Sequence, residues 1–89
     1  MSKVIIQYPL QFTHGDQEVL ASPNAEFLTV QTQEGQPFLW ALVDKRCKQE
    51  RTHILNFYFS YSPIPTNPGK YLATLQAYGQ VWHAFIEEI

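Results

Sequence analysis

Residues 26–44, with the sequence EFLTVQTQEGQPFLWALVD, predict a β-hairpin around which the rest of the chain is arranged. Two runs rich in β-branched and aromatic residues flank Glu34-Gly35. A glycine in the second position of a two-residue loop favours a tight primed turn. Counting outward from this turn places Val30 opposite Leu39, and the pattern therefore predicts two neighbouring antiparallel strands with a defined register.

Both faces of this predicted hairpin carry apolar side chains. The same count places Thr29 opposite Trp40, Leu28 opposite Ala41 and Phe27 opposite Leu42. One face then holds Leu28, Val30, Leu39, Ala41 and Val43, and the other holds Phe27, Phe38, Trp40 and Leu42. A hairpin that is apolar on both faces has to be covered on both, by its own chain or by a partner. We expect the chain itself to cover it and Trp40 to be a buried, structural residue.

Other runs of the chain also alternate as strands do. They are residues 3–8, residues 17–21, residues 52–60 and the two runs on either side of Tyr78-Gly79. Pro9 ends the first run and suits an edge strand, since proline cannot donate to a ladder. Counting from Tyr78-Gly79 pairs Leu75 with Trp82, Ala73 with Ala84 and Tyr71 with Ile86. The run after Gly79 also fits an amphipathic helix, but its bulky residues and the preceding turn favour a strand.

The connections are equally informative about the fold. Residues 61–69 hold three prolines and a glycine and are expected to form a surface loop. Residues 45–51 form a polar, solvated connection between two apolar strands. We predict an all-β fold in a single domain over residues 1–89, either a small antiparallel β-sandwich or a partly open barrel of about six to seven short strands.

Composition limits the classes of function. Charged residues make up 16% of the 89 residues and the formal net charge is −2. We therefore expect no non-specific nucleic-acid binding, which depends on clustered Lys and Arg. The sequence has no run long enough for a membrane span, no secretory leader and a single cysteine, Cys47, so we expect a cytoplasmic protein without membrane attachment. The low charge and the two-faced hairpin favour a homodimer.

The residues that usually carry catalysis or bind metals form no recognisable pattern. His14, His53 and His83 lie far apart without the spacing of zinc ligands, and the glycines make no phosphate-binding loop. Cys47 lies in a basic run but has no partner base nearby in the sequence, which favours an incidental exposed thiol. We predict that the protein is not an enzyme and uses no cofactor or metal.

The best candidate for a binding site is the basic connection together with the aromatic residues that follow it. Cationic side chains bind phosphate by charge-assisted hydrogen bonds, and tyrosines stack on bases. The candidate ligand-binding or partner-binding residues are Arg46, Lys48, Arg51, Tyr58 and Tyr61. A run of charge between strands is also the ordinary composition of a soluble loop.

Several motifs along the chain resemble a known family. They are Tyr8-Pro9-Leu10, the block over residues 30–44, Pro63-Ile64, and Gly79 followed by Val81-Trp82-His83. Together they resemble a family of small uncharacterised domains encoded mainly by bacteriophages and prophages. Where that family often has Gly-His before the Pro-Ile step, this chain has Tyr61-Ser62. The resemblance implies a phage accessory protein without an assigned activity.

These observations favour a non-catalytic binding module of phage or prophage type. We expect it to bind a host protein, in particular a defence-related one, through exposed apolar and aromatic residues. The alternative is a protein that sequesters a nucleotide-like signalling molecule against Arg46, Arg51 and Tyr58. Titration with nucleotides and capture of proteins from host lysate distinguish these two hypotheses.

Overall fold

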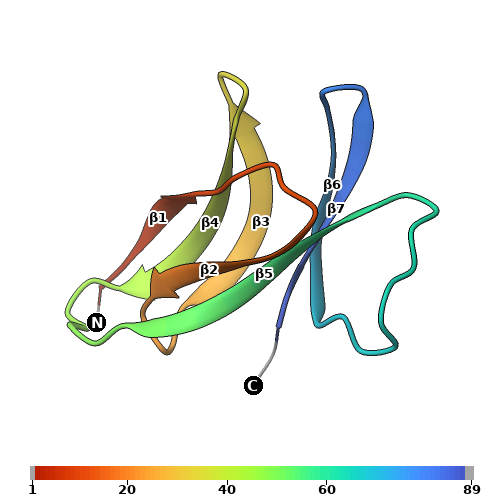
Figure 1. Ribbon diagram of the computed structural model, residues 1–89. Coiled ribbons are helices and arrows are strands. Elements are labelled where there is room, and N and C mark those ends of the chain that lie inside the picture. The colour runs from red at the N-terminus through yellow and green to blue at the C-terminus, as the bar shows by residue number, and fades with distance from the viewer. Residues whose placement is uncertain (1, 88–89) are drawn as a thin grey trace.

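The computed structural model describes residues 2–87 and has an all-β fold (Figure 1). Seven strands are present: β1 (Lys3–Pro9), β2 (Gly15–Ala21), β3 (Glu26–Gln33), β4 (Gln36–Asp44), β5 (Arg51–Phe59), β6 (Lys70–Ala77) and β7 (Gln80–Ile86). They form two antiparallel sheets, in the orders β1-β4-β3 and β2-β5-β7-β6. The predicted all-β class is confirmed, the final run is a strand, and the sheets do not close into a barrel. In the described part of the chain there is no helix that could cross a membrane.

The β3–β4 hairpin has the predicted turn but only part of the predicted register. Glu34 and Gly35 have positive φ angles of 53° and 80°, as both central residues of a primed turn require. The pairs Val30–Leu39 and Thr29–Trp40 are confirmed. Before Thr29 the prediction is wrong, because a β-bulge at Leu28 shifts the pairing.

The bulge decides which side chains of β3 reach the core. Phe27 pairs with Ala41, not with Leu42, and is 8% exposed. Leu28, the extra residue, is 40% exposed. An unbulged strand would have placed Leu28 inside and Phe27 outside, since neighbouring residues of a strand point to opposite faces.

The β6–β7 hairpin repeats this arrangement. Its turn consists of Tyr78 and Gly79, with φ angles of 53° and 72°, and the predicted pairs Leu75–Trp82 and Ala73–Ala84 are present. A second bulge, between Tyr71 and Ala73, makes Tyr71 pair with Phe85 and not, as predicted, with Ile86.

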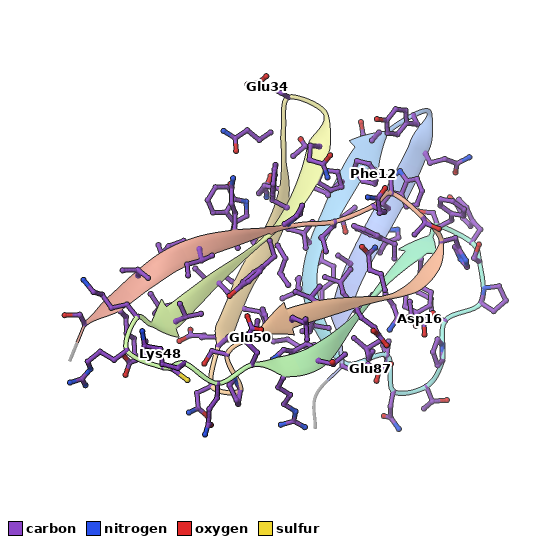
Figure 2. All side chains as sticks on the ribbon, turned by 60° about the vertical axis from the view of Figure 1, so that its left-hand side comes forward. Phe12, Asp16, Glu34, Lys48, Glu50 and Glu87 are labelled. Carbon is purple, nitrogen blue, oxygen red and sulfur yellow. The ribbon has the colours of Figure 1, made fainter. Side chains whose placement is uncertain are left out.

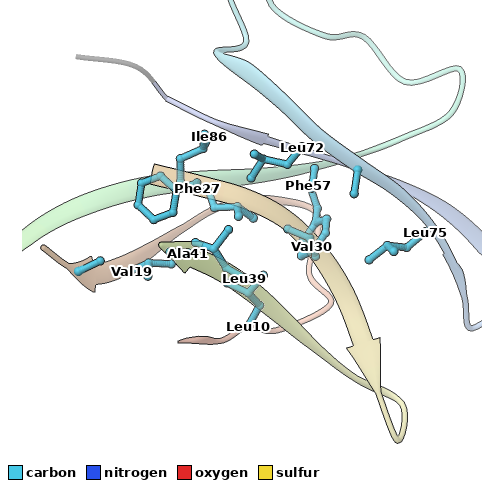
Figure 3. Close-up of a cluster of buried hydrophobic side chains, with 14 of the residues drawn as sticks. Leu10, Val19, Phe27, Val30, Leu39, Ala41, Phe57, Leu72, Leu75 and Ile86 are labelled. Carbon is cyan, nitrogen blue, oxygen red and sulfur yellow. The ribbon is translucent and has the colours of Figure 1, made fainter. Parts of the chain in front are cut away.

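The core lies between the two sheets (Figure 3). β4 alternates regularly, with Leu39, Ala41 and Val43 buried at 0 to 5% exposure. β3 lies against β6, so the sheets approach each other along these two strands (Figure 1). Trp40 points away from the core and is half-buried, so the prediction that it is a core residue is wrong. The alternation of β4 gives the inner positions to its odd-numbered residues.

Candidate functional site

The outer face of the three-stranded sheet is the first candidate surface. The register places Ile5 of β1 beside Leu42 of β4 and Gln7 beside Trp40. We call Ile5, Phe38, Trp40 and Leu42 the aromatic face. Ile5 is 61% exposed and the three β4 residues are half-buried, with polar residues of β3 beside them. An apolar centre with a large aromatic residue and a polar surround is the composition of a protein-binding surface.

One end of the aromatic face is cationic. Lys3 pairs with Asp44, and Arg46 Nε lies 3.7 Å from Asp44 Oδ1. The Lys45 N–H donates to the Ser2 carbonyl at 3.3 Å, which holds the connection after β4 beside the start of β1. Figure 2 shows Lys48 in this connection, at the opposite end of the hairpin from Glu34. Lys3, Lys45, Arg46 and Lys48, four of the six Lys and Arg residues, therefore lie at this end, where they outnumber the carboxylates of Asp44 and Glu26.

The second candidate is a cleft of about 370 Å³ between the sheets. It is lined by Pro23, Ala25, Glu26, Phe27, Arg51, His53, Lys70, Ile86 and Glu87. The wall is apolar in part and carries two cationic and two acidic side chains. Such a mixture of apolar surface with a few polar groups is usual for small-molecule sites.

Two of the polar side chains in this cleft are held by backbone carbonyls. Lys70 Nζ donates to the Phe27 carbonyl at 3.2 Å, beside the bulge of β3. His53 is 8% exposed, and its Nε2 donates to the Ser22 carbonyl at 3.1 Å. This bond assigns the proton to Nε2, since a carbonyl oxygen only accepts. The ring of Phe27 meets His53 edge-on, with centroids 4.8 Å apart.

A neighbouring hollow of about 480 Å³ shares Glu87 with the cleft and is lined also by residues 66–69. Glu87 is held by its N–H, which donates to the Ile54 carbonyl at 2.8 Å, and by Asn56 Nδ2, which donates to Glu87 Oε2 at 3.4 Å. Burial raises the pKa of Tyr58, and the negative charges of Glu87 and Asp16 raise it further. Glu87 and Asp16 therefore place negative charge beside Tyr58 on this side of the four-stranded sheet, which disfavours an anionic ligand there.

The structure does not bring the five sequence-predicted site residues together. Arg46 and Lys48 lie at the cationic end of the aromatic face, and Arg51 lines the cleft. Tyr58 is buried near the other end of β5, roughly 23 Å from Arg51 at about 3.3 Å per residue. Tyr61 is fully exposed in the following loop, with a φ of 68°. The roles of these five residues remain predictions, but they cannot form one site.

The structure also joins residues that the sequence did not connect. His83 Nε2 and Ser60 Oγ are 2.8 Å apart, and His83 Nδ1 lies 3.0 Å from Thr74 Oγ1. Thr74 Oγ1 is in turn 2.7 Å from the Tyr71 hydroxyl. The predicted β6–β7 register already implied the Thr74–His83 neighbours, whereas Ser60 could not be placed from the sequence.

This network has a serine beside a histidine, as hydrolases do, but not the orienting group that they use. A carboxylate in the third position stabilises the imidazolium that forms when the histidine takes the serine proton. Thr74 is neutral and lacks that capacity. The network favours a structural role, in which Ser60 fixes the start of the 60–69 connection against β7. Among residues 2–87, no cluster of three His, Cys, Asp or Glu side chains has the arrangement of a metal site.

The fold and these surfaces define a small all-β domain with a partly exposed aromatic sheet face and a mixed-charge cleft. By its sequence the chain belongs to the family described as Domain of unknown function (DUF7352), whose match covers residues 1–89. No curated protein and no solved structure matches the chain.

Proposed function

We propose that the protein is a non-catalytic binding module that recognises a protein partner through the aromatic face. The resemblance to phage and prophage domains supports a partner from the bacterial host, and we propose a defence-related protein as that partner. The protein thus acts by occupying its target and not by a chemical reaction.

The observation that carries this proposal is the position of Trp40. It lies in the middle of β4, the central strand of its sheet, yet on the face that points away from the core. Partly exposed aromatic surface carries a cost in solubility, and tryptophan is among the residues enriched in binding hot spots. Trp40 therefore adds no volume to the core between the sheets, and part of its ring is accessible to a partner.

The charges beside the aromatic face indicate which kind of partner surface would be complementary to it. The cationic end of the aromatic face contrasts with the net charge of −2 of the whole chain. A complementary partner presents an apolar patch with carboxylates at one edge, because complementary charges raise the association rate and exclude wrong partners.

Affinity capture with matched variants tests the proposal. The immobilised parent, Trp40→Ala and Tyr71→Ala are each exposed to lysate of a bacterial host, and captured proteins are quantified. Tyr71 is the control, because it is an aromatic residue, 54% exposed, on the other sheet. A partner whose capture falls about tenfold or more with Trp40→Ala and stays unchanged with Tyr71→Ala supports the proposal. Equal capture by all three proteins contradicts it.

The cleft supports a second candidate function, the sequestration of a nucleotide-like signalling molecule. Arg51 and Lys70 line the same cleft and supply the positive charge that a phosphate requires. Phe27 and Ile86 supply apolar surface for a base. The site predicted from the sequence included Tyr58 and Arg46, which lie outside the cleft. In the cleft, Lys70 and His53 take their places beside Arg51.

Calorimetric titration separates the two functions. Cyclic and linear nucleotides are titrated into the parent, Arg51→Ala and Arg46→Ala. Binding that is lost only in Arg51→Ala supports the cleft. Absence of binding to the parent, or equal loss in both variants, rejects the cleft as a nucleotide site and leaves the aromatic face as the candidate.

A further inference from the structure

β1 is an edge strand whose centre is apolar and uncovered. It pairs with β4 on one side only. Val4, Ile5 and Ile6 are 36%, 61% and 39% exposed. Three β-branched residues in a row at a free edge are unusual in a soluble domain, because such an edge can pair with another chain.

The hydrogen bonds at the two ends of β1 show which backbone groups remain free. The Leu10 N–H donates to the Pro37 carbonyl at 3.0 Å, and the Ser2 carbonyl accepts from Lys45. Residues at even positions therefore face β4, since backbone direction alternates along a strand and β1 has no register shift. The N–H and carbonyl groups of Lys3, Ile5 and Gln7 point to the open edge.

The other edges of the two sheets in residues 2–87 are protected. β3 and β6 each carry a bulge and lie against each other. β2 presents Asp16 and Glu18, whose charges would repel a second copy. Bulges and charges are the usual devices that prevent edge pairing. The centre of β1 has neither a bulge nor a charged residue, and its only protective residues are Lys3 and Pro9 at its two ends.

We infer that β1 is a homodimer interface, in which β1 of one copy pairs antiparallel with β1 of a second copy about a two-fold axis at Ile5. Ile5 lies opposite its symmetry mate, and Lys3 lies opposite Gln7 of the other copy. Each pair exchanges both of its N–H···O=C bonds, so all the free backbone groups of this segment are satisfied. The three strands of each copy then form one continuous sheet.

The sequence of β1 disfavours two other axes. An axis at Ile6 would place Pro9 opposite Lys3, where proline has no N–H to donate. An axis at Lys3 would place two ammonium groups directly opposite each other. The axis at Ile5 avoids both and, on the opposite face, pairs Val4 with Ile6 of the second copy. β-branched cross-strand pairs of this kind stabilise sheets.

Pairing at β1 also covers apolar side chains that are exposed in the single chain. Val4 and Ile6 point to the same face as Leu39 and Ala41, at the open side of the core. In the dimer each of them is covered by the other copy. On the outer face the two aromatic faces become continuous through the Ile5 pair. The inference does not depend on the proposed function, although it would present two aromatic faces on one surface.

The oligomeric state of matched variants tests the interface. Light scattering at micromolar concentration should give twice the 10.3 kDa chain mass for the parent and the single-chain mass for Ile5→Lys, which places like charges opposite each other on the axis. Leu20→Lys is the control, because Leu20 is 57% exposed on the edge strand of the other sheet and should leave the dimer intact. A single-chain parent, or a dimeric Ile5→Lys with an unchanged circular dichroism spectrum, overturns the inference.

Oxidative cross-linking tests the register. In a Cys47→Ser background, Ile5→Cys places two thiols on Cα atoms about 5.5 Å apart, within the range of about 4.4–6.8 Å for a disulfide. Gln7→Cys places them roughly 13 Å apart along the strands, at about 3.4 Å per residue, and should not cross-link. The opposite result, or equal cross-linking of both, rejects the axis at Ile5.

These tests are separable from the test of the proposed function. Trp40→Ala should remain a dimer while it loses the partner, because Trp40 does not lie on β1. Failure of the dimer would leave partner capture by the aromatic face intact, and failure of partner capture would leave the mass of the parent unchanged.

Discussion

The Nζ atom of Lys70 lies 3.2 Å from the carbonyl oxygen of Phe27 and donates a hydrogen bond to it. This bond joins the first residue of β6 to β3, so it crosses from one sheet to the other. The bond lies beside the bulge at Leu28, which interrupts the register of β3 next to this carbonyl. The cleft is formed at the same place, so its cation also holds the two sheets together.

Replacement of Lys70 by Met should lower the free energy of unfolding by about 1–2 kcal/mol. The methionine retains the apolar stem, while the charge-assisted bond to a partly buried carbonyl is lost. Urea denaturation measures the change. Lys48→Met, in the exposed connection, is the matched control and should change it by less than about 0.5 kcal/mol. Equal effects of both variants would mean that the bond contributes nothing.

Adjacent residues of β4 should differ sharply in their contribution to stability. Leu39 is 0% exposed, and Leu39→Ala should cost about 2–5 kcal/mol through lost burial and a residual cavity. Trp40 is half-buried on the outer face, and Trp40→Ala should cost about 1–2 kcal/mol, since only part of the ring leaves contact with the protein. Thermal and urea denaturation of both variants make the comparison. If Trp40→Ala were as damaging as Leu39→Ala, the ring would be structural and the aromatic face would lose its support as a binding surface.

The parts of the fold that follow from local chemistry could be predicted from the sequence. Glu34-Gly35 and Tyr78-Gly79 identify their turns by composition, and the register beside each turn follows by counting. The counting fails at the two bulges, because nothing in the residues around Leu28 or Leu72 marks an extra residue. Beyond each bulge, the side chains of the strand point to the faces opposite to those predicted. The sequence therefore placed Phe27 on the face of Trp40 and Leu28 on the face of Val30, whereas Phe27 is buried in the core and Leu28 is exposed.

The site could be predicted less well than the fold, and for a related reason. Arg51 and Tyr58 are near neighbours in the sequence, but an extended strand separates them by most of its length. The residues that do meet in the cleft, Arg51, Lys70 and Glu87, come from three separate parts of the chain. The pairing of β6 with β7 and of β7 with β5 brings them to the same end of the four-stranded sheet, and no local sequence pattern encodes the pairing of β5 with β7.

Two glycines with the same backbone conformation allow a second test of packing. Gly69 has a φ of 102°, and a Cβ built there would collide with the Ile86 carbonyl oxygen. Gly15 has a φ of 105°, and a Cβ there would meet nothing within 4 Å. Gly69→Ala should be more destabilising than Gly15→Ala by about 1–3 kcal/mol, because only the first adds a clash to the shared strain of a positive φ. Equal urea midpoints for the two variants would show that the loop moves away from Ile86 without cost.

The last prediction concerns the pH dependence of stability. Burial raises the pKa of Tyr58 above its ordinary value of 10.0, and the charges of Glu87 and Asp16 raise it further. A group whose pKa is higher in the folded state than in the unfolded state holds its proton more tightly when folded. Its contribution is therefore fully present below pH 10, and it is lost as the pH rises through the folded-state pKa.

Stability should accordingly fall as the pH is raised above about 10, and Tyr58→Phe should make this decline shallower because phenylalanine has no proton to lose. Tyr8, whose pKa is raised by burial and by Glu50, contributes in the same direction, so Tyr58→Phe should remove only part of the slope. Urea denaturation between pH 8 and pH 11 measures the effect. Tyr61→Phe, at a fully exposed side chain, is the control and should follow the parent. A parallel decline for the parent and Tyr58→Phe would show that the Tyr58 hydroxyl is solvated and that the acidic side of the four-stranded sheet does not act on it.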